Sequence, residues 1–195
     1  MSLRSAAGTP ARCAWDWLAR AHPEPGHARA LLRTYGRAAL QTGVLWDVVQ
    51  VREGTGLRVL AEGAVSGPAF RDVRRGAVKF LVPVDGEWRV RGTACLADSA
   101  MVCVPAPDIG APAPSPERPR VEEPPPLYWL TPPDGSGRLT DRAALRTGLA
   151  SAPEPDIDHP WCARCGLPLP TPSARGDVPV HDVCAPGAWA DGGAG

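Results

Sequence analysis

Three cysteines and one histidine near the end of the chain have the types and the spacing that metal binding requires. Cys162 and Cys165 are separated by two residues, fifteen residues follow, and His181 and Cys184 are again separated by two. Thiolate sulfur and imidazole nitrogen are the common ligands of tetrahedral zinc, and closely spaced pairs of them are typical of small zinc modules. We therefore predict that Cys162, Cys165, His181 and Cys184 bind one Zn²⁺ ion.

The predicted zinc site is structural rather than catalytic, because four protein ligands leave no open coordination position. A tail of about 35 residues is too short to build its own hydrophobic core, so the metal would hold it together. Cysteines with no shared role are one alternative, and a redox role is another, since Trp161 precedes the Cys162–Cys165 pair as in the thioredoxin motif. That motif needs a helix after it, and the prolines that follow disfavour one. His159 is a spare candidate ligand.

Composition and charge limit the folds and partners that are possible for the rest of the chain. Of 195 residues, 44% are hydrophobic, which suffices for one core, while 24 prolines and 21 glycines limit regular structure. Residues 1–104 carry 14 basic and 9 acidic side chains, and residues 151–195 carry 2 and 6. A basic body with an acidic tail is compatible with an anionic partner. Without a signal peptide or a long apolar run, we expect a cytoplasmic protein with no membrane partner.

The hydrophobic pattern predicts an ordered domain over residues 1–150. Two helices, a strand, a helix, several strands and a final helix indicate an α/β domain, with α+β as the alternative, in which helices flank a mixed sheet. The expected helices cover residues 11–21, 27–40, 54–62 and 140–149. The expected strands cover residues 44–51, 69–73, 77–84, 88–91, 94–96, 101–104 and 127–131. Thr55 and Thr140 are the expected N-caps, and Cys13, Cys95 and Cys103 are expected in the core.

Two proline-rich stretches divide the chain. Residues 105–126 contain nine prolines and form an expected insertion within the domain, because strand and helix patterns resume after it. Residues 151–160 form an expected acidic linker. The zinc-binding module follows over residues 161–195, with an end that we expect to be disordered.

Two groups of basic residues are candidate contacts for nucleic acid. Arg29, Arg33 and Arg37 recur every four residues along the expected second helix, and Arg74, Arg75 and Lys79 belong to the expected hairpin. Cations arranged in this way can contact successive phosphates. A solvated polar face is the simpler interpretation of both groups, and the sequence alone leaves the choice open.

A series of short motifs runs through the second half of the domain. It comprises Gly67-Pro68, Val78-Lys79-Phe80-Leu81-Val82-Pro83, Val90-Arg91-Gly92-Thr93, Asp98-Ser99-Ala100-Met101-Val102-Cys103-Val104-Pro105 and Tyr128-Trp129, preceded by Trp46-Asp47-Val48-Val49. In order and type these motifs resemble the prim-pol domain of bifunctional DNA primase/polymerases. The resemblance covers about 90 residues, and it implies a nucleotidyl-transfer fold whose carboxylates hold two Mg²⁺ ions.

The sequence differs from that family at the positions that correspond to its catalytic residues. The paired Asp-x-Asp of the family is reduced to Asp47, its histidine is replaced by Lys79, and its later carboxylate falls near Ala94, with Asp98 close by in sequence. One carboxylate cannot hold two metal ions. The resemblance therefore implies a catalytically silent copy.

Three functions are compatible with these residues. The first is a non-enzymatic accessory or binding protein with a structural zinc site, associated with nucleic acid through a degenerate primase-like domain. The second is a protein-interaction adaptor that uses the zinc module and the proline-rich loop. The third is a nucleotidyltransferase that uses Asp47 with partners placed elsewhere in the chain. We expect no catalytic residue under the first two functions.

Overall fold

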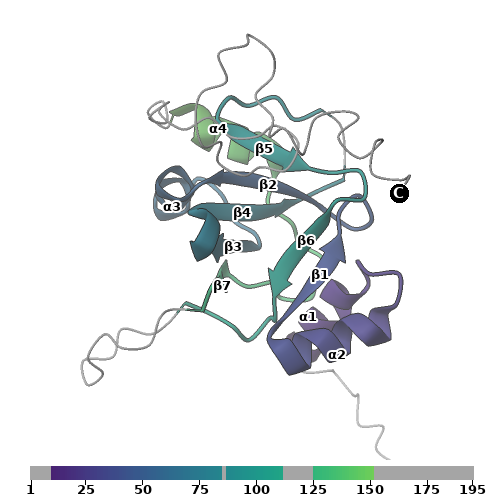
Figure 1. Cartoon of the computed structure of the whole chain (residues 1–195). Helices are drawn as coiled ribbons and strands as arrows, with labels where there is room; N and C mark the ends of the chain where they lie inside the picture. Colours follow the sequence, from purple (N-terminus) through teal and green to yellow (C-terminus); the bar gives the residue numbers. More distant parts are fainter. Residues whose placement is uncertain (1–9, 85–86, 112–124, 152–195) are drawn as a thin grey trace, which may run out of the picture.

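The computed structural model describes residues 10–84, 87–111 and 125–151, which form an α+β fold with two antiparallel sheets and flanking helices (Figure 1). The expected combination of a sheet with flanking helices is thus confirmed, in its α+β form. Its helices are α1 (Pro10–Ala19), α2 (Pro25–Tyr35), α3 (Glu53–Ala61), the short 3-10 helix η1 (Val73–Arg75) and α4 (Arg142–Ser151). Its strands are β1 (Arg37–Gln41), β2 (Asp47–Arg52), β3 (Ala69–Asp72), β4 (Ala77–Val82), β5 (Thr93–Leu96), β6 (Met101–Pro105) and β7 (Leu127–Thr131).

The larger sheet has five strands in the order β5-β2-β4-β3-β7, and the smaller sheet pairs β1 with β6. Every strand pair in the described part of the chain is antiparallel, so the sheet is not the mixed one that we expected. The single parallel contact there is an isolated bridge between Gly110 and Trp129. A short turn joins only β3 to β4, and the other pairs bring together strands that lie far apart in the sequence.

Apolar side chains cover both faces of the larger sheet, and this explains the continuous apolar run in β2. Val49 and Val51 point to the same side as Phe80 and pack with residues of α3 and α4, including Val59 and Leu145. The next set of strand residues packs on the other side with α1, α2 and the smaller sheet, and comprises Val48, Phe70 and Leu81 with Trp17, Leu32 and Leu40. A strand that is buried on both faces loses the alternation of apolar and polar residues.

The second helix is shorter than the sequence predicts. It ends at Tyr35, and Gly36 follows in the left-handed conformation at φ 67°, a common helix stop. Arg37 then begins β1, in which Ala38 and Leu40 alternate into the core while Ala39 is exposed. The apolar spacing fits both a helix and a strand, and the tertiary contacts decide for the strand. Tyr35, the last residue of the helix, is 68% exposed.

The segment before β5 is not a strand, although we expected one over residues 88–91. Trp88 instead donates a hydrogen bond from Nε1 to Thr93 Oγ1 at 2.8 Å, and the guanidinium of Arg146 lies over its ring at 5.2 Å from the centroid. These side-chain contacts hold the segment against α4 without strand pairing.

Both predicted N-caps are wrong. Thr55 lies inside α3, which begins at Glu53. Thr140 is buried, and Asp141 caps α4 by accepting a hydrogen bond from the Ala144 N–H at 2.7 Å. Asp and Thr are both good capping residues, so their adjacency hides which of them is used.

The hairpin of β3 and β4 is confirmed, with η1 at its turn and Gly76 at φ 56°. The side chain of Asp72 accepts a hydrogen bond from the Arg75 N–H at 3.3 Å and so closes the turn. The hairpin therefore holds Asp72, Arg75 and Lys79 in fixed relative positions.

The proline-rich stretch, the acidic linker and the zinc-binding module are described by the structure only in small part. Within the proline-rich stretch, Ala106 is buried and Trp129 donates from Nε1 to the Ala106 carbonyl at 3.0 Å. Residues 112–124, the linker after Ser151 and the zinc-binding module lie outside the described residues. Among the helices that the structure describes, none has the length and apolar character needed to cross a membrane.

Replacing Gly67 with alanine is expected to destabilise the fold by about 2–4 kcal/mol. Gly67 has φ 133°, and a Cβ atom there would lie 2.6 Å from both the backbone N and the Oγ1 of Thr140. Urea unfolding measures the change. Gly63→Ala is the matched control, because Gly63 also has a positive φ of 66° but no atom lies within 4 Å of the position that its Cβ would take. Equal losses in the two variants would contradict the packing explanation.

Candidate functional site

Asp47, the single acidic residue of β2, forms a buried ion pair. It is 4% exposed, and its Oδ2 accepts a hydrogen bond from Arg142 Nη2 at 2.7 Å. Arg142 begins α4 and also donates from Nε to the Pro83 carbonyl at 2.8 Å. Desolvation raises the pKa of the Asp47 carboxyl, and Arg142 opposes that rise through its charge and its hydrogen bond. The pair thus joins α4 to the start of β2.

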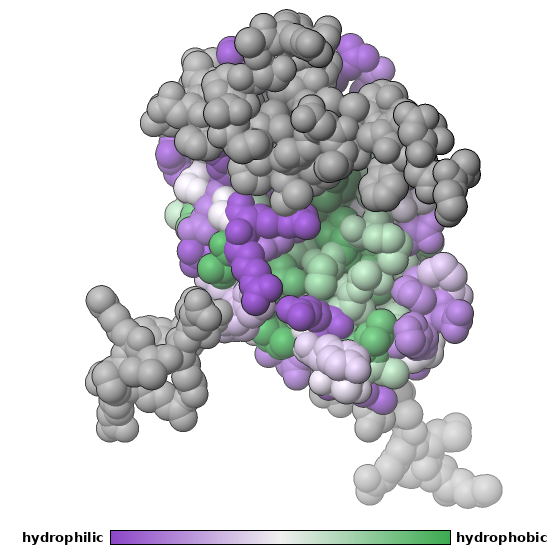
Figure 2. Space-filling view, viewed as in Figure 1, coloured by the Kyte–Doolittle hydropathy of each residue, from purple (hydrophilic) through white to green (hydrophobic). Residues whose placement is uncertain are grey.

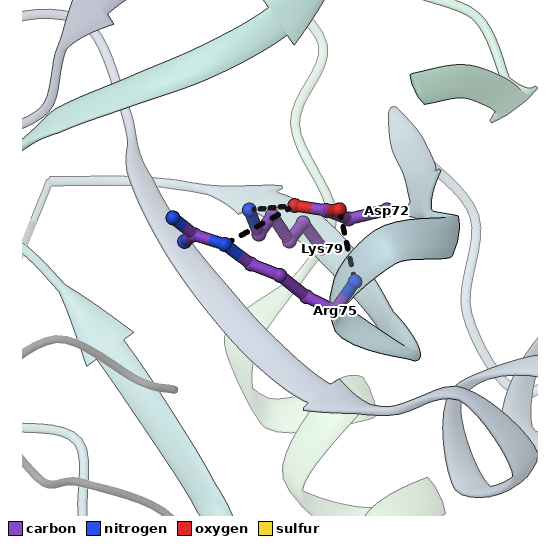
Figure 3. A network of polar contacts seen from close by, with 3 residues as sticks. All are labelled: Asp72, Arg75 and Lys79. Carbon is purple, nitrogen blue, oxygen red and sulfur yellow. Dashed lines mark hydrogen bonds and ion pairs between the residues drawn. The ribbon is translucent and has the colours of Figure 1, made fainter. Parts of the chain in front are cut away.

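Lys79 forms a second buried ion pair on the hairpin (Figure 3). It is 2% exposed, and its Nζ lies 2.8 Å from Asp72 Oδ2. Arg75 Nε approaches the same oxygen at 3.7 Å. Desolvation lowers the pKa of the Lys79 ammonium, against the hydrogen bond and the charge of Asp72, and the charge of Arg75 adds to the lowering. The Lys79 side chain is therefore buried, whereas both interpretations of the sequence place it in solvent.

The register of the sheet places Asp47 and Lys79 on opposite faces. Asp47 pairs with Val82, whereas Lys79 pairs with Gln50. Because side chains alternate between faces, residues three positions apart on β4 point to opposite sides. Gln50 also pairs with Ala94 on β5, so Lys79, Gln50 and Ala94 form one row across one face.

Of the β2 residues, Gln50 rather than Asp47 shares a sheet face with Lys79 and Ala94, the positions compared above with the histidine and the later carboxylate of the prim-pol domain. The sequence led us to Asp47, but the side chain of β2 that lies beside Lys79 and Ala94 is Gln50, which is 1% exposed. Gln50 was missed because only the strand pairing distinguishes the two faces. A neutral amide at the centre of the row supplies no charge with which to hold a divalent cation.

In the part of the chain that the structure describes, carboxylates do not gather around Asp47. The charge of Asp98 raises the pKa of Asp47 less than desolvation does, and Asp98 itself is exposed in a turn. Within residues 10–84, 87–111 and 125–151, no group of three histidine, cysteine or acidic side chains is placed to hold a metal ion. In the described part of the chain, Asp47 acts as a partner of Arg142.

The predicted arginine row along the second helix is broken in the structure. Arg29 pairs with Asp16 at 3.0 Å, Arg33 is exposed on α2, and Arg37 belongs to β1. Figure 2 shows strongly hydrophilic residues gathered beside an apolar surface on the side from which Figure 1 is viewed. Four of the six basic candidates are exposed, namely Arg33, Arg37 and, at the turn of the hairpin, Arg74 and Arg75.

The cysteines of the domain differ from expectation. Cys13 and Cys103 are exposed and Cys95 is half-buried, so none of the three belongs to the buried core. Desolvation nevertheless raises the pKa of the Cys95 and Cys103 thiols. A raised pKa keeps a thiol protonated and unreactive at neutral pH.

Comparison with known proteins adds no assignment. A scan against protein-family models, a search of curated proteins and a search of solved structures each returned no match. Function must therefore be inferred from the residues and their geometry.

The four predicted zinc ligands, Cys162, Cys165, His181 and Cys184, lie outside the described residues. Their chemistry makes a direct prediction, because three thiolates and one imidazole bind zinc far more tightly than a pair of them. We expect about one zinc ion per purified chain, and its loss in Cys165→Ser. Elemental analysis of the two proteins measures this, with Cys13→Ser as the matched control. Purified full-length protein that is folded but metal-free would contradict the prediction.

Proposed function

We propose that this protein is a non-enzymatic binding protein that associates with nucleic acid through the exposed arginines of its body and carries a structural zinc ion in its C-terminal module. The observation that supports the non-enzymatic part most directly is the buried ion pair between Asp47 and Arg142. The Asp47 carboxylate is buried against Arg142 and faces away from Lys79 and Gln50. A metal-dependent transferase needs clustered carboxylates that face one bound substrate.

The two buried ion pairs account for three charged side chains of the larger sheet, Asp47, Asp72 and Lys79. Burial of a lone charge is costly, so each of these charges is held beside an opposite one. Asp47 with Arg142 fixes α4, and Asp72 with Lys79 fixes the hairpin. Their role in this proposal is to position the exposed surface rather than to react.

The nucleic-acid part rests on arginines that stay in solvent. Arg33 and Arg37 lie on α2 and β1, and Arg74 and Arg75 lie on the hairpin turn. A guanidinium matches the geometry of a phosphate and keeps its charge at every physiological pH. Binding through such contacts would be tolerant of sequence, because phosphates carry no base information.

Removing two of these arginines is expected to weaken binding measurably. Fluorescence anisotropy with a labelled single-stranded and a labelled double-stranded oligonucleotide compares wild type with Arg74→Ala/Arg75→Ala. We expect an affinity loss of about tenfold or more for the double variant, since each charged contact contributes about 1 kcal/mol or more. Arg138→Ala, an exposed arginine before α4, is the control. Binding that is equal in all three proteins would exclude the hairpin arginines.

A further inference from the structure

Two histidine rings lie side by side at the connection between α1 and α2 (Figure 1). The ring centroids of His22 and His27 are 5.7 Å apart, and the ring planes are inclined at 47°. His22 is half-buried after the end of α1, and His27 is exposed in the first turn of α2. Neither residue belongs to the predicted zinc site or to the proposed contacts with nucleic acid.

The backbone around the two histidines is fixed before any ligand binds. Pro23 and Pro25 each restrict a φ angle of the connection, and Pro25 is also the first residue of α2. The residues next to the histidines, Ala21 and Ala28, are 1% and 0% exposed and belong to the core between the helices and the sheets. A ligand that contacts both rings therefore has little chain to order.

The hydrogen bonds of His22 match those of a metal-binding histidine. The Glu24 N–H donates to its Nδ1 at 2.9 Å, and the Glu24 carbonyl oxygen lies 3.1 Å from the same nitrogen. In the other tautomer, Nδ1–H donates to that carbonyl and the lone pair of Nε2 is free for a metal ion. Metal-binding histidines commonly donate their second ring N–H to a backbone carbonyl in this way, which fixes both the tautomer and the ring orientation.

The separation of the rings is compatible with one shared ion. Imidazole nitrogen binds Zn²⁺ at about 2.0–2.1 Å, so two rings that share an ion have centroids within about 6.5 Å of each other. The observed 5.7 Å falls inside that limit. Imidazole suits Ni²⁺, Cu²⁺ and Zn²⁺. Since the described residues place no third histidine, cysteine or acidic ligand with the pair, water or an added chelator would hold the other coordination positions.

We propose that His22 and His27 form a binding site for a divalent transition-metal ion such as Cu²⁺ or Ni²⁺, held by one nitrogen of each ring. The site is separate from the predicted zinc module and does not depend on the proposed function. Two protein ligands bind less tightly than four, so the ion exchanges with solution instead of holding the fold together. A bound ion joins the end of α1 to the start of α2 and stabilises their connection.

Cu²⁺ capped by iminodiacetate is the direct probe, because the chelator leaves coordination positions for two imidazoles. The full chain is first loaded with zinc, so that the C-terminal thiolates are occupied. Pulsed electron paramagnetic resonance counts the coordinated imidazoles, and we expect two in wild type and one in each of His22→Gln and His27→Gln. Each variant should also bind the probe about tenfold more weakly, since the second ligand no longer acts within the same molecule. His159→Gln is the matched control and should behave as wild type does.

Thermal unfolding gives a second measurement of the same site. The probe should raise the Tm of wild type and of His159→Gln, and it should leave the Tm of the two pair variants nearly unchanged. A single coordinated imidazole in wild type would overturn the site. So would equal affinity for the probe in wild type and in the double variant His22→Gln/His27→Gln. Oligonucleotide binding is measured separately, so failure of this site would leave the proposed function standing.

Discussion

Replacing Arg142 with methionine is expected to lower the free energy of unfolding by about 3–5 kcal/mol at neutral pH. The change leaves the Asp47 carboxylate buried without its counter-charge, and α4 loses its hydrogen bond to the Pro83 carbonyl. Urea unfolding followed by circular dichroism measures the loss. Arg138→Met, in an exposed position before the same helix, is the control and should change little.

The cost of Arg142→Met should shrink as the solution is acidified. Desolvation already holds the pKa of Asp47 above its ordinary value, and Arg142 is the group that limits the rise. Without Arg142 the pKa rises further, so the folded variant binds a proton that the unfolded chain does not. Its stability is therefore lost as pH rises above the ordinary aspartate pKa, and it is regained as pH falls back towards that value. A loss that is independent of pH would contradict the electrostatic explanation.

Replacing Asp72 with asparagine is expected to be the other large effect, at about 3 kcal/mol or more near neutral pH. The variant keeps the shape of the side chain but removes the counter-charge of an ammonium that is 2% exposed. The double variant Asp72→Asn/Lys79→Met should lose less than Asp72→Asn alone, because no buried charge is left without a partner. Glu87→Gln, in an exposed pair with Arg89, is the control.

The stability of Asp72→Asn should depend on pH in the opposite direction to that of Arg142→Met. Desolvation lowers the pKa of Lys79, and Asp72 opposes that lowering, so the pKa falls further in Asp72→Asn. The unfolded chain then binds more protons than the folded chain between the lowered pKa and the ordinary lysine value. Stability of the variant should therefore rise as pH is raised through that range. Thermal unfolding at a series of alkaline pH values checks this, and a cost unchanged by pH would count against the buried-charge explanation.

Local sequence signals predicted most of the elements. The β3–β4 hairpin has Gly76 at its turn, and β7 covers the predicted residues 127–131, because turn chemistry and short apolar runs specify these features locally. The helix beginning at Pro25 was predicted as well, but its end was not. Ala38 and Leu40 fit a helix or a strand, and only pairing of β1 with β6 resolves which one forms.

The candidate site depended on information that no single segment contains. Asp47 was the candidate site residue because it is the one charged residue in the predicted apolar strand. Its partner Arg142 lies 95 residues further along the chain. Gln50 attracted no attention, yet strand register places it between Lys79 and Ala94. The burial of Lys79 was likewise hidden, since a lysine on a hairpin is ordinarily solvated.

The proposed function is tested most directly by the salt dependence of oligonucleotide binding. Fluorescence anisotropy of a labelled single-stranded oligonucleotide, titrated with the full chain at a series of salt concentrations, gives the slope of log affinity against log salt. Two to four phosphate contacts through exposed arginines predict a slope of about −1.4 to −2.8, at about −0.7 per contact. Absence of binding at low salt, or binding with a slope of zero, would contradict the proposed function.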